Sequence, residues 1–453
     1  MPLISKTEIP GPGRFARGVH PADRKGLSAG AAVEVLPTPK SVLVPLVQHI
    51  GAPCQAVVKP RAEVAIGDVL GRADAFVSAA VHASIDGTTG PETVTTLPNA
   101  RHVPAIPVTA AETQSLAGRA LWDDVYGGDW PTKGLDAGAP DAIAAAVRDA
   151  GLVGMGGAAF PTHVKLARNP KRPVDTLIVN GCECEPYLTS DHRLMLEAPE
   201  PIVVGALLAA SAAGAERIIV AIEDNKPDAI DALRAAADGT SVRVAPVRTH
   251  YPMGGERQVI PAVMAREVPT GGLPLDVGVV VLNVATAAAV ARAVLRGKPA
   301  THRIVSVTGE GVANPKNILA PVGAAYADLV DFCGGLTGDA ERIIAGGPMM
   351  GFALPSLDAA VTKGTSGVVV LTARQVARTR ETACIRCGRC VDVCPLHLVP
   401  TKMALAARHG NWETARRYHL AACCECGCCA YVCPAGIPLV QLMRMGKATM
   451  PKE

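Results

Sequence analysis

Two cysteine runs near the C-terminus carry the strongest chemical signal in the sequence. The run from Cys384 to Pro395 has the spacing C-x2-C-x2-C-x3-C-P, and the run from Cys423 to Pro434 repeats it. This spacing is typical of domains with two [4Fe–4S] clusters, in which the fourth cysteine of each run binds the other cluster. We expect one cluster on Cys384, Cys387, Cys390 and Cys433, and a second on Cys423, Cys426, Cys429 and Cys394.

The distribution of the cysteines favours iron–sulfur clusters over structural zinc or unreactive thiols. Ten of the 14 cysteines lie in the last 70 residues, whereas zinc sites usually use two spaced pairs. Cys424 and Cys428 are surplus and offer alternative triplets, but only the chosen set reproduces both gaps and the final Cys-Pro. Cys182 and Cys184 have no second pair nearby, and we expect them to be buried lining. Two clusters relay single electrons and carry no substrate chemistry, so another group must deliver the electrons.

A glycine-rich segment in the middle of the chain is a candidate phosphate site. Gly154, Gly156 and Gly157 lie in GLVGMGGAAFPT, between two helix-like stretches. Glycines let backbone N–H groups approach a phosphate, and a helix that begins near Pro161 would add its positive end. Lys165, one turn into that helix, is a candidate phosphate or flavin partner. The segment does not follow a predicted strand, so a flexible hinge stays an alternative.

Polar residues also follow the predicted strands of this region. Asn180, Glu183 and Glu185 come after the strand-like DTLIVN, where open α/β sheets bind ligands. The two glutamates could bind ribose hydroxyls or a nicotinamide amide, or they could be solvated loop acids. The segment YPMGGE precedes a predicted helix, and two polar residues follow the last strand. We expect one pocket formed by Asn180, Glu183, Glu185, Gly254, Gly255, Glu256, Asn283 and Thr286.

The N-terminal part of the chain is predicted to be an arm followed by a small β module. Residues 1–36 are rich in Gly and Pro and are expected to be irregular. Residues 37–135 are predicted to form short strands, with a hairpin turn at Asp86-Gly87 and a linker over 111–135. The pattern suggests a sandwich of the biotinyl/lipoyl type. No Lys occurs between Lys59 and Lys133, so we expect no covalently attached cofactor.

The rest of the chain is predicted to be multidomain α/β, with a helical end. Strands and helices alternate over 136–298, which predicts a mainly parallel sheet. Its helices are expected around 192–214, 226–238, 256–266 and 284–296. Residues 299–373 are predicted to form a small α+β module, and 374–453 the cysteine-rich domain with a helical link.

Composition excludes several classes of protein. A length of 453 residues predicts about three domains, and 49% apolar residues supply their cores. A net charge of +3 and 3% aromatic residues argue against a nucleic-acid partner. The longest apolar stretches, Ile202–Ala215 and Val277–Ala291, fall short of the roughly 20 residues of a membrane-spanning helix. MPLISKTEIP lacks the pattern of a signal peptide. These features predict a soluble, cytoplasmic protein without a transmembrane helix of its own.

Longer motifs are shared with a known family. They include GVHPADRK, PLVQHIGAP, GLVGMGGAAFPTHVKL, NGCECEPYLTSDHRLMLE, YPMGGERQ, VTGEGVANPKNILAPVG and the two cysteine runs. Over roughly residues 14–447, the chain resembles the RnfC component of the Rnf electron-transport complex. Its middle is also similar, more distantly, to the flavin-binding subunit of respiratory complex I.

The resemblance implies a domain order and a set of site residues. It implies an all-β barrel-sandwich-like module, a Rossmann-like FMN/NADH-binding domain at 136–298, a β-grasp (SLBB) module at 299–373, and a ferredoxin-like double [4Fe–4S] domain at 374–453. The implied FMN site is Gly154, Gly156, Gly157, Lys165, Asn180, Glu183, Gly254, Gly255, Asn283 and Thr286. Glu185 and Glu256 match positions that help to hold NADH. Cys182 replaces an acid, and Gly255 a Glu, of the complex I relatives.

The resemblance also implies a function. NADH gives up two electrons as hydride whereas the clusters accept one at a time, so a flavin must stand between them. The implied protein is the NADH-oxidising, or NAD-reducing, electron-input subunit of the membrane-bound Rnf complex. Its electrons would pass through FMN and both clusters to partner subunits, including the ferredoxin-like RnfB component, and so to ferredoxin. The complex would couple this transfer to ion translocation, with the chain peripheral on the cytoplasmic side of the cell inner membrane.

Two alternatives contain some of the same parts. A cobalamin reductase of bacterial microcompartments shares the flavin, β-grasp and double-cluster modules, but the long arm with GVHP and QHIGAP favours the Rnf component. A cluster-bearing scaffold that has lost flavin activity is the other alternative. The glycine-rich loop and Lys165 argue against it.

The cysteine spacing predicts the metal content of the purified protein. Iron and acid-labile sulfide assays on anaerobically prepared protein should each find about eight atoms per chain, because each cubane holds four of each. A preparation that contains zinc and no sulfide would contradict the assignment.

Overall fold

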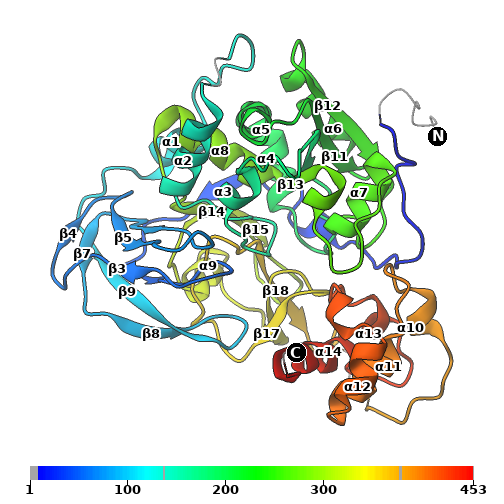
Figure 1. The fold of residues 1–453 in the computed structure, drawn as a ribbon. Coiled ribbons are helices and arrows are strands. Elements are labelled where there is room, and N and C mark those ends of the chain that lie inside the picture. The colour runs from blue at the N-terminus through cyan, green and yellow to red at the C-terminus, as the bar shows by residue number, and fades with distance from the viewer. Residues whose placement is uncertain (1–8, 136–137, 377–379, 452–453) are drawn as a thin grey trace.

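The computed structural model describes residues 9–135, 138–376 and 380–451. Figure 1 shows an α/β domain, a β module beside it, a β-grasp domain below, and a helical cysteine-rich domain at the C-terminal end. The first eight residues, on which the expectation about a signal peptide depends, lie outside the described residues, as does the predicted boundary at 136. The predicted domain limits stay predictions.

The α/β domain is built on a four-stranded parallel sheet, as the alternation of strands and helices predicts. The sheet has the order β12-β11-β10-β13. Its strands are β10 (Thr176–Asn180), β11 (Arg217–Glu223), β12 (Val242–Val247) and β13 (Val279–Asn283). The helices of the domain are α2 (Pro140–Asp149), α3 (Thr162–Leu166), α4 (Ser190–Glu197), α5 (Pro199–Ala213), α6 (Pro227–Ala237), α7 (Glu256–Met264) and α8 (Val284–Arg296), with a 3-10 turn η2 (Pro274–Val277).

Helices cover both faces of this sheet. Alternate residues of the strands point into two separate apolar cores, one of which contains α5 and α8 and the other α7. This arrangement requires strands that are apolar on both sides, and β10, β11 and β13 are almost entirely buried. Because all four strands run in parallel, their carboxyl ends meet at one edge, which the polar residues of the candidate site follow.

The single helix expected around 192–214 is two helices. Pro199 is the first residue of α5, where its missing N–H would have no partner within the helix. The residue before a proline is disfavoured from helical backbone angles, so α4 ends before Ala198. In the described part of the chain, no single helix is long and apolar enough to cross a membrane. The pair α4 and α5 meets the length and composition test together, but it bends by 96° at the break.

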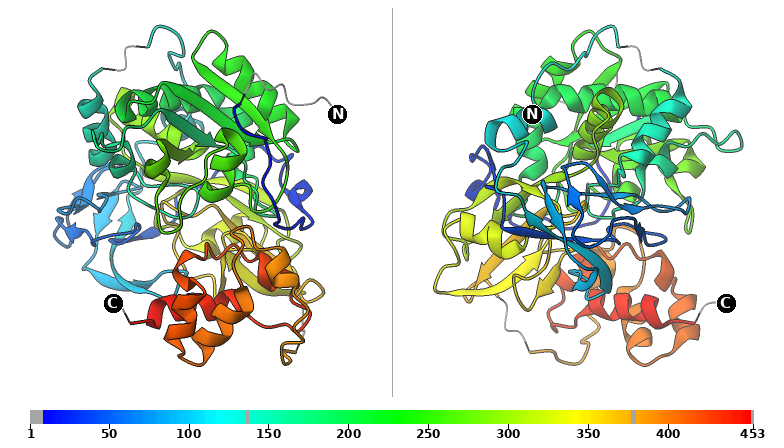
Figure 2. Two further views of the ribbon diagram at one scale, coloured as in Figure 1. Left: turned by 45° about the vertical axis from the view of Figure 1, so that its right-hand side comes forward. Right: turned by 90° about the vertical axis from the view of Figure 1, so that its left-hand side faces the viewer.

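The N-terminal module consists of two small antiparallel sheets (Figure 2). One has the order β2-β9-β7-β4, with β8 also paired to β9, and the other has the order β3-β5-β6. Their bounds are β2 (Ser41–Pro45), β3 (Gln55–Ala56), β4 (Glu63–Val64), β5 (Val69–Arg72), β6 (Val81–His82), β7 (Gly87–Thr89), β8 (Thr93–Thr96) and β9 (His102–Ala110).

The predicted hairpin turn at Asp86-Gly87 is wrong. The chain leaves β6 in one sheet there and enters β7 in the other, so the two residues do not join paired strands. The Asp86 carboxylate accepts hydrogen bonds from the Ile66 and Ser115 amides. Gly87 begins β7, where a Cβ would lie 2.1 Å from the Thr109 carbonyl oxygen. The Asp-Gly pair therefore lies where the chain passes from one sheet to the other.

The arm and the linker are more ordered than the sequence predicts. Residues 33–35 of the arm form β1 (Val33–Val35), which pairs in parallel with β15 (Lys316–Pro321) of the β-grasp sheet. The arm also holds a 3-10 turn, η1 (Lys25–Leu27). In the predicted linker, α1 (Gly118–Val125) packs Trp122 into the main core, and Trp130 is buried there as well. Both segments are ordered by partners that lie far along the chain, which local patterns do not reveal.

The β-grasp domain is a mixed sheet with one helix. Its strand order is β1-β15-β14-β18-β16-β17. Its elements are β14 (His302–Thr308), β15 (Lys316–Pro321), α9 (Tyr326–Phe332), β16 (Ala340–Ala345), β17 (Phe352–Leu354) and β18 (Gly367–Thr372). The expected β-grasp fold agrees with this arrangement.

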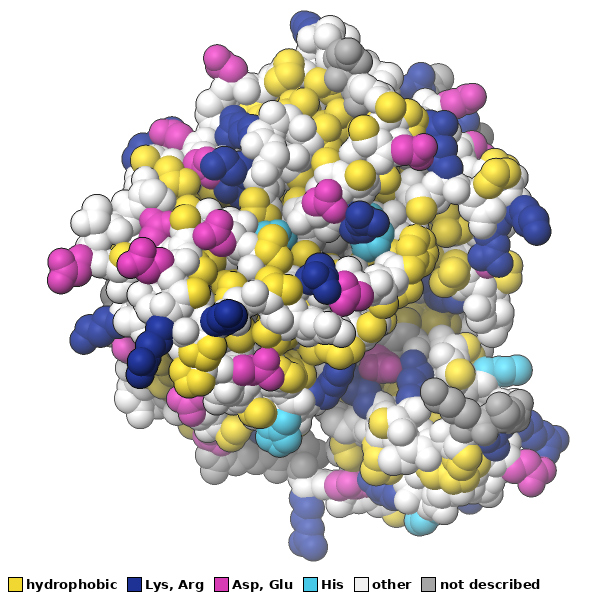
Figure 3. Space-filling model, turned by 60° about the vertical axis from the view of Figure 1, so that its left-hand side comes forward, with side chains coloured by type: hydrophobic (Ala, Val, Ile, Leu, Met, Phe, Trp, Pro, Cys, Tyr) yellow, Lys and Arg dark blue, Asp and Glu magenta, His cyan; other side chains and the backbone are white. Residues whose placement is uncertain are grey.

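The cysteine-rich domain is helical, as predicted. Its helices are α10 (Arg389–Asp392), α11 (Pro400–Arg408), α12 (Trp412–Arg417), the 3-10 turn η3 (Leu420–Ala422), α13 (Cys428–Tyr431) and α14 (Leu439–Thr449). Figure 3 shows acidic and basic side chains interspersed over one face of the molecule. That face, as far as its residues are described, carries no broad basic patch of the kind that nucleic acid requires.

The packing of α5 against α8 depends on a glycine. A Cβ on Gly205 would lie 1.7 Å from the Ala287 carbonyl oxygen in α8. Replacement of a helical Gly by Ala ordinarily stabilises a helix by ~1 kcal/mol. Here we expect Gly205→Ala to lower stability by about 1–3 kcal/mol, because the helices must separate. A lowered Tm would confirm this. Gly30→Ala, with no atom within 4 Å of the added Cβ, is the control, and equal Tm values would contradict the prediction.

Candidate cofactor and electron-transfer site

The predicted flavin residues meet at the carboxyl edge of the parallel sheet. Asn180 ends β10 and Asn283 ends β13, and the two are register partners. Asn283 also caps α8, since its Oδ1 accepts hydrogen bonds from the amides of Ala285 and Thr286. The sheet therefore places two amide side chains from distant segments next to each other.

The glycine-rich loop lies over this edge. The Met155 amide donates to Thr286 Oγ1 at 2.9 Å, and a Cβ on Gly156 would lie 3.4 Å from Asn283 Cβ. Gly157 has a φ of +103° and open space around it. In the described ranges, no group accepts a hydrogen bond from the amides of Gly156 and Gly157, and both residues are exposed. Unpartnered amides in a glycine loop fit a phosphate.

The YPMGGE segment closes the other side. Asn180 Nδ2 donates to the Gly254 carbonyl at 2.8 Å, and a Cβ on Gly254 would lie 3.0 Å from Cys184 Sγ. Lys165 Nζ donates to Glu256 Oε1 at 2.5 Å and to the Val281 carbonyl at 3.1 Å. Lys165 is 26% exposed and Glu256 39% exposed. This half-exposed pair leaves both charges accessible to a ligand.

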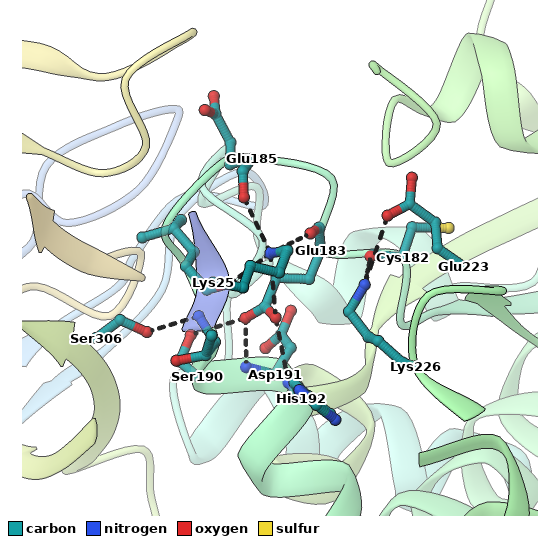
Figure 4. Close-up of polar contacts among 12 residues, drawn as sticks. Lys25, Cys182, Glu183, Glu185, Ser190, Asp191, His192, Glu223, Lys226 and Ser306 are labelled. Carbon is teal, nitrogen blue, oxygen red and sulfur yellow. Dashed lines mark hydrogen bonds and ion pairs between the residues drawn. The ribbon is translucent and has the colours of Figure 1, made fainter. Parts of the chain in front are cut away.

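Glu183 and Glu185 lie in the same region (Figure 4), and both carboxylates already have protein partners. Glu183 accepts hydrogen bonds from the amides of Asp191 and His192 at the start of α4. Glu185 accepts from the amides of Met349 and Met350, at 3.0 and 2.8 Å. Burial raises the pKa of Glu185 to about 7, against the effect of these two amides. The two glutamates therefore tie the loop after β10 to other segments.

The structure adds residues that sequence reasoning missed. Asp191 Oδ2 accepts from Asn283 Nδ2 at 2.5 Å; burial, followed by the nearby Glu183 carboxylate, raises the pKa of Asp191 to about 7. Lys25 and Lys226 are buried and donate to carbonyls of the loop after β10. Lys25 and Asp191 lie within GVHPADRK and the NGCECEPYLTSDHRLMLE motif, so the motifs contained them although no chemical pattern singled them out.

The two cysteine runs fold alike. In each run, the residues on either side of the second cysteine have left-handed φ values: +57° at Arg386 and +80° at Gly388, then +59° at Glu425 and +86° at Gly427. Each run continues into a four-residue helix, α10 or α13, and these helices pack together. The two runs therefore share a backbone geometry as well as a cysteine spacing.

The second cysteine set lines a partly open pocket. Its lining includes all four cysteines predicted for one cluster, together with the two surplus ones: Cys394, Cys423, Cys424, Cys426, Cys428 and Cys429. The amides of Leu398 and Glu425 donate to the sulfurs of Cys394 and Cys423. Amide donors to cysteine sulfur are the kind of contact that tunes iron–sulfur clusters. These residues fit a [4Fe–4S] cluster.

The first cysteine set is more open. Cys390 is buried, Cys384 and Cys433 are half-buried, and Cys387 is exposed. Cys384, Cys390 and Cys433 belong to one apolar core with Cys429 of the other set. The two predicted cluster sites are therefore neighbours within one small domain.

The second cysteine run lies directly against the α/β domain. Tyr251 Oη donates to the Cys426 carbonyl at 2.6 Å, and Cys184 packs in one apolar cluster with Tyr251, Cys426 and Cys428. Cys182 is fully buried, as the lining interpretation predicts. Because Tyr251 begins the segment that carries Gly254, one short stretch touches both the candidate flavin site and a candidate cluster.

Comparison with protein families gives four matches in chain order. They are an RnfC barrel sandwich hybrid domain at 13–112, a Nuo51 FMN-binding domain at 147–292, an SLBB domain at 304–353 and a 4Fe-4S dicluster domain at 381–437. They confirm the expected fold class, and FMN and two [4Fe–4S] clusters as the cofactors. The site residues stay predictions.

Curated relatives match over almost the whole chain. The C component of the proton-translocating ferredoxin:NAD(+) oxidoreductase complex of Clostridium ljungdahlii is 43% identical, over 96% of this chain and 93% of the relative. The chain belongs to the RnfC family. The C component of the Na(+)-translocating complex of Acetobacterium woodii is 40% identical, over 88% of this chain and 89% of its own. The C component of the ion-translocating oxidoreductase complex of Rhodobacter capsulatus is 40% identical, over 96% of this chain and 82% of its own.

These relatives do not favour the cobalamin reductase or the flavin-free scaffold. A solved NAD+-reducing [NiFe]-hydrogenase, in the H2-reduced state, has a TM-score of 0.50 at 23% identity, over 71% of this chain and 64% of its own. That similarity is one of fold alone.

The raised pKa of the half-buried Asp191 predicts a pH-dependent stability. Its pKa is about 7 in the folded protein against 3.8 ordinarily, so between pH 4 and 7 the folded state holds a proton that the unfolded state releases. Stability therefore falls as pH rises through that window. Asp191→Asn cannot ionise, so the free energy of unfolding should fall less between pH 5 and 8 in the variant, by about 2 kcal/mol. Denaturant titrations at both pH values measure this, and identical pH profiles would contradict it.

Proposed function

We propose that this chain is the electron-input subunit of an ion-translocating ferredoxin:NAD+ oxidoreductase complex. The observation that carries the proposal is the contact of Tyr251 with the second cysteine run. It joins a flavin-type sheet edge to a cluster domain within one chain. A hydride donor or acceptor and single-electron relays can exchange electrons only where the two sites adjoin.

The residues at the sheet edge have different proposed roles in cofactor binding. We assign the phosphate to the free amides of Gly156 and Gly157 and to Lys165, since these are the cationic or donor groups that remain accessible. Asn180, Asn283 and Thr286 hold the loop and strand ends in register. We assign Glu256 and Glu185 to NADH binding, because they match positions that help to hold NADH in related proteins. When bound, FMN would take up two electrons as one hydride and release them one at a time, or carry out the reverse.

The cysteine-rich domain supplies the exit for electrons. Cys423, Cys426, Cys429 and Cys394 would hold the cluster next to Tyr251, and Cys384, Cys387, Cys390 and Cys433 the outer one. Cys387 of the outer set is exposed, which suits transfer to a partner. The partners are the other Rnf subunits, among them the ferredoxin-like RnfB component, and through them ferredoxin. We infer a peripheral position on the cytoplasmic side of the cell inner membrane.

An anaerobic NADH titration of the FMN-loaded protein tests the proposal. We expect NADH to bleach the flavin absorbance and then to produce the electron paramagnetic resonance signal of reduced [4Fe–4S] clusters. Glu185→Ala should raise the KM for NADH about tenfold, a loss of ~1.4 kcal/mol of binding, because it removes a carboxylate and frees two Met amides.

Glu267→Ala is the matched control, since Glu267 is an exposed residue just beyond the end of α7 and lies outside the candidate site. It should leave the KM unchanged. Flavin that stays oxidised in wild-type protein with NADH present would rule out NADH as the electron donor.

A further inference from the structure

A lysine of the N-terminal arm reaches into the candidate site. Lys25 is 7% exposed, although lysine side chains are almost always solvated. Its Nζ donates to the carbonyls of Glu183, Glu185 and Leu188, at 2.9, 3.0 and 2.5 Å. Figure 4 shows the amine at the centre of the loop that follows β10.

The three hydrogen bonds use the full donor capacity of an ammonium group. The Glu183 carboxylate, 3.7 Å away, supplies the countercharge. Burial lowers the pKa of Lys25, and the charge of Glu183 opposes that shift. Each N–H of this buried ammonium has a carbonyl partner. If one carbonyl moved away, it would leave an unpaired donor out of contact with water, which costs free energy, so the three carbonyls are held in place.

The chain on both sides of Lys25 is fixed to the same loop. The Asp23 carbonyl accepts from the Tyr187 amide at 2.7 Å, and Ser28 Oγ lies 2.8 Å from Thr189 Oγ1. The arm therefore follows the loop for several residues, with Lys25 at the middle of the contact.

We propose that Lys25 is a positioning residue for flavin and NADH binding. It holds the loop of residues 182–188, which carries Glu183 and Glu185, in its binding conformation by fixing three carbonyls at once. The inference rests on the proposed function, because it assigns that loop to the cofactor site. Lys25 does not touch the ligand. It acts through the backbone of residues that do.

The test uses the full chain with its clusters, as Lys25→Gln and Lys25→Met variants. Gln keeps two N–H donors and loses the charge, whereas Met keeps most of the length and loses both. We expect FMN affinity to fall and the KM for NADH to rise, each about threefold for Gln and at least tenfold for Met. The kcat at saturating FMN and NADH, and the iron content, should change less than about twofold.

Lys316→Met is the matched control. Lys316 also joins the arm to another domain, through Glu34 at 2.9 Å, but it lies outside the loop. It should bind FMN and NADH like wild type. Hydrogen exchange should speed up in residues 181–189 of the Lys25 variants and stay unchanged in the control.

Each result decides between interpretations. Wild-type values in both Lys25 variants would overturn the inference while leaving the proposed function intact. A parallel loss of iron, FMN and helical signal in both variants would assign Lys25 to general folding and also overturn it. If wild-type protein itself fails to react with NADH, the proposed function fails, independently of Lys25.

Discussion

The arrangement of the molecule depends on one physical constraint: a two-electron carrier and one-electron clusters exchange electrons only at close approach. The two cofactor sites belong to different domains, and side-chain and backbone contacts between these domains bring them together. Tyr251 bonds the backbone of the second cysteine run, and Gly427 lies so near Met349 that a Cβ would come within 2.5 Å of its carbonyl oxygen. Arg444 of α14 donates to the Met350 carbonyl. The carboxyl edge of the parallel sheet, the β16–β17 loop of the β-grasp domain and the cluster domain thus meet at one junction.

The loop after β10 is the element on which these contacts converge. Its carbonyls are held by two buried lysines, Lys25 from the arm and Lys226 from the start of α6. Its acidic side chains bond outward, Glu183 to α4 and Glu185 to the Met349–Met350 amides. The loop is therefore fixed from several sides, which suits the proposed position of this segment between the cofactor site and a cluster.

Features of the fold and the site could be predicted from the sequence where the pattern that marks them spans only a few residues. The cysteine runs and the strands β10 to β13 were predictable because their patterns lie within a few residues. Lys25 and the pairing of β1 were not, because their partners lie far along the chain. Asp86-Gly87 has the composition of a hairpin turn, yet it stands at a crossing between two sheets. Short-range patterns cannot distinguish these cases.

The arm shows why the long-range contacts matter beyond stability. Arg17 Nη1 donates to the Val391 carbonyl and the Gly18 amide to that of Val393, while Val19 bridges to Tyr251. A few residues later, Lys25 binds the loop after β10. One short peptide therefore contacts the cluster domain, the Tyr251 segment and the loop after β10 in succession. Because it is bonded to all three, the arm ties the cluster domain to the edge of the parallel sheet at which the predicted flavin residues meet.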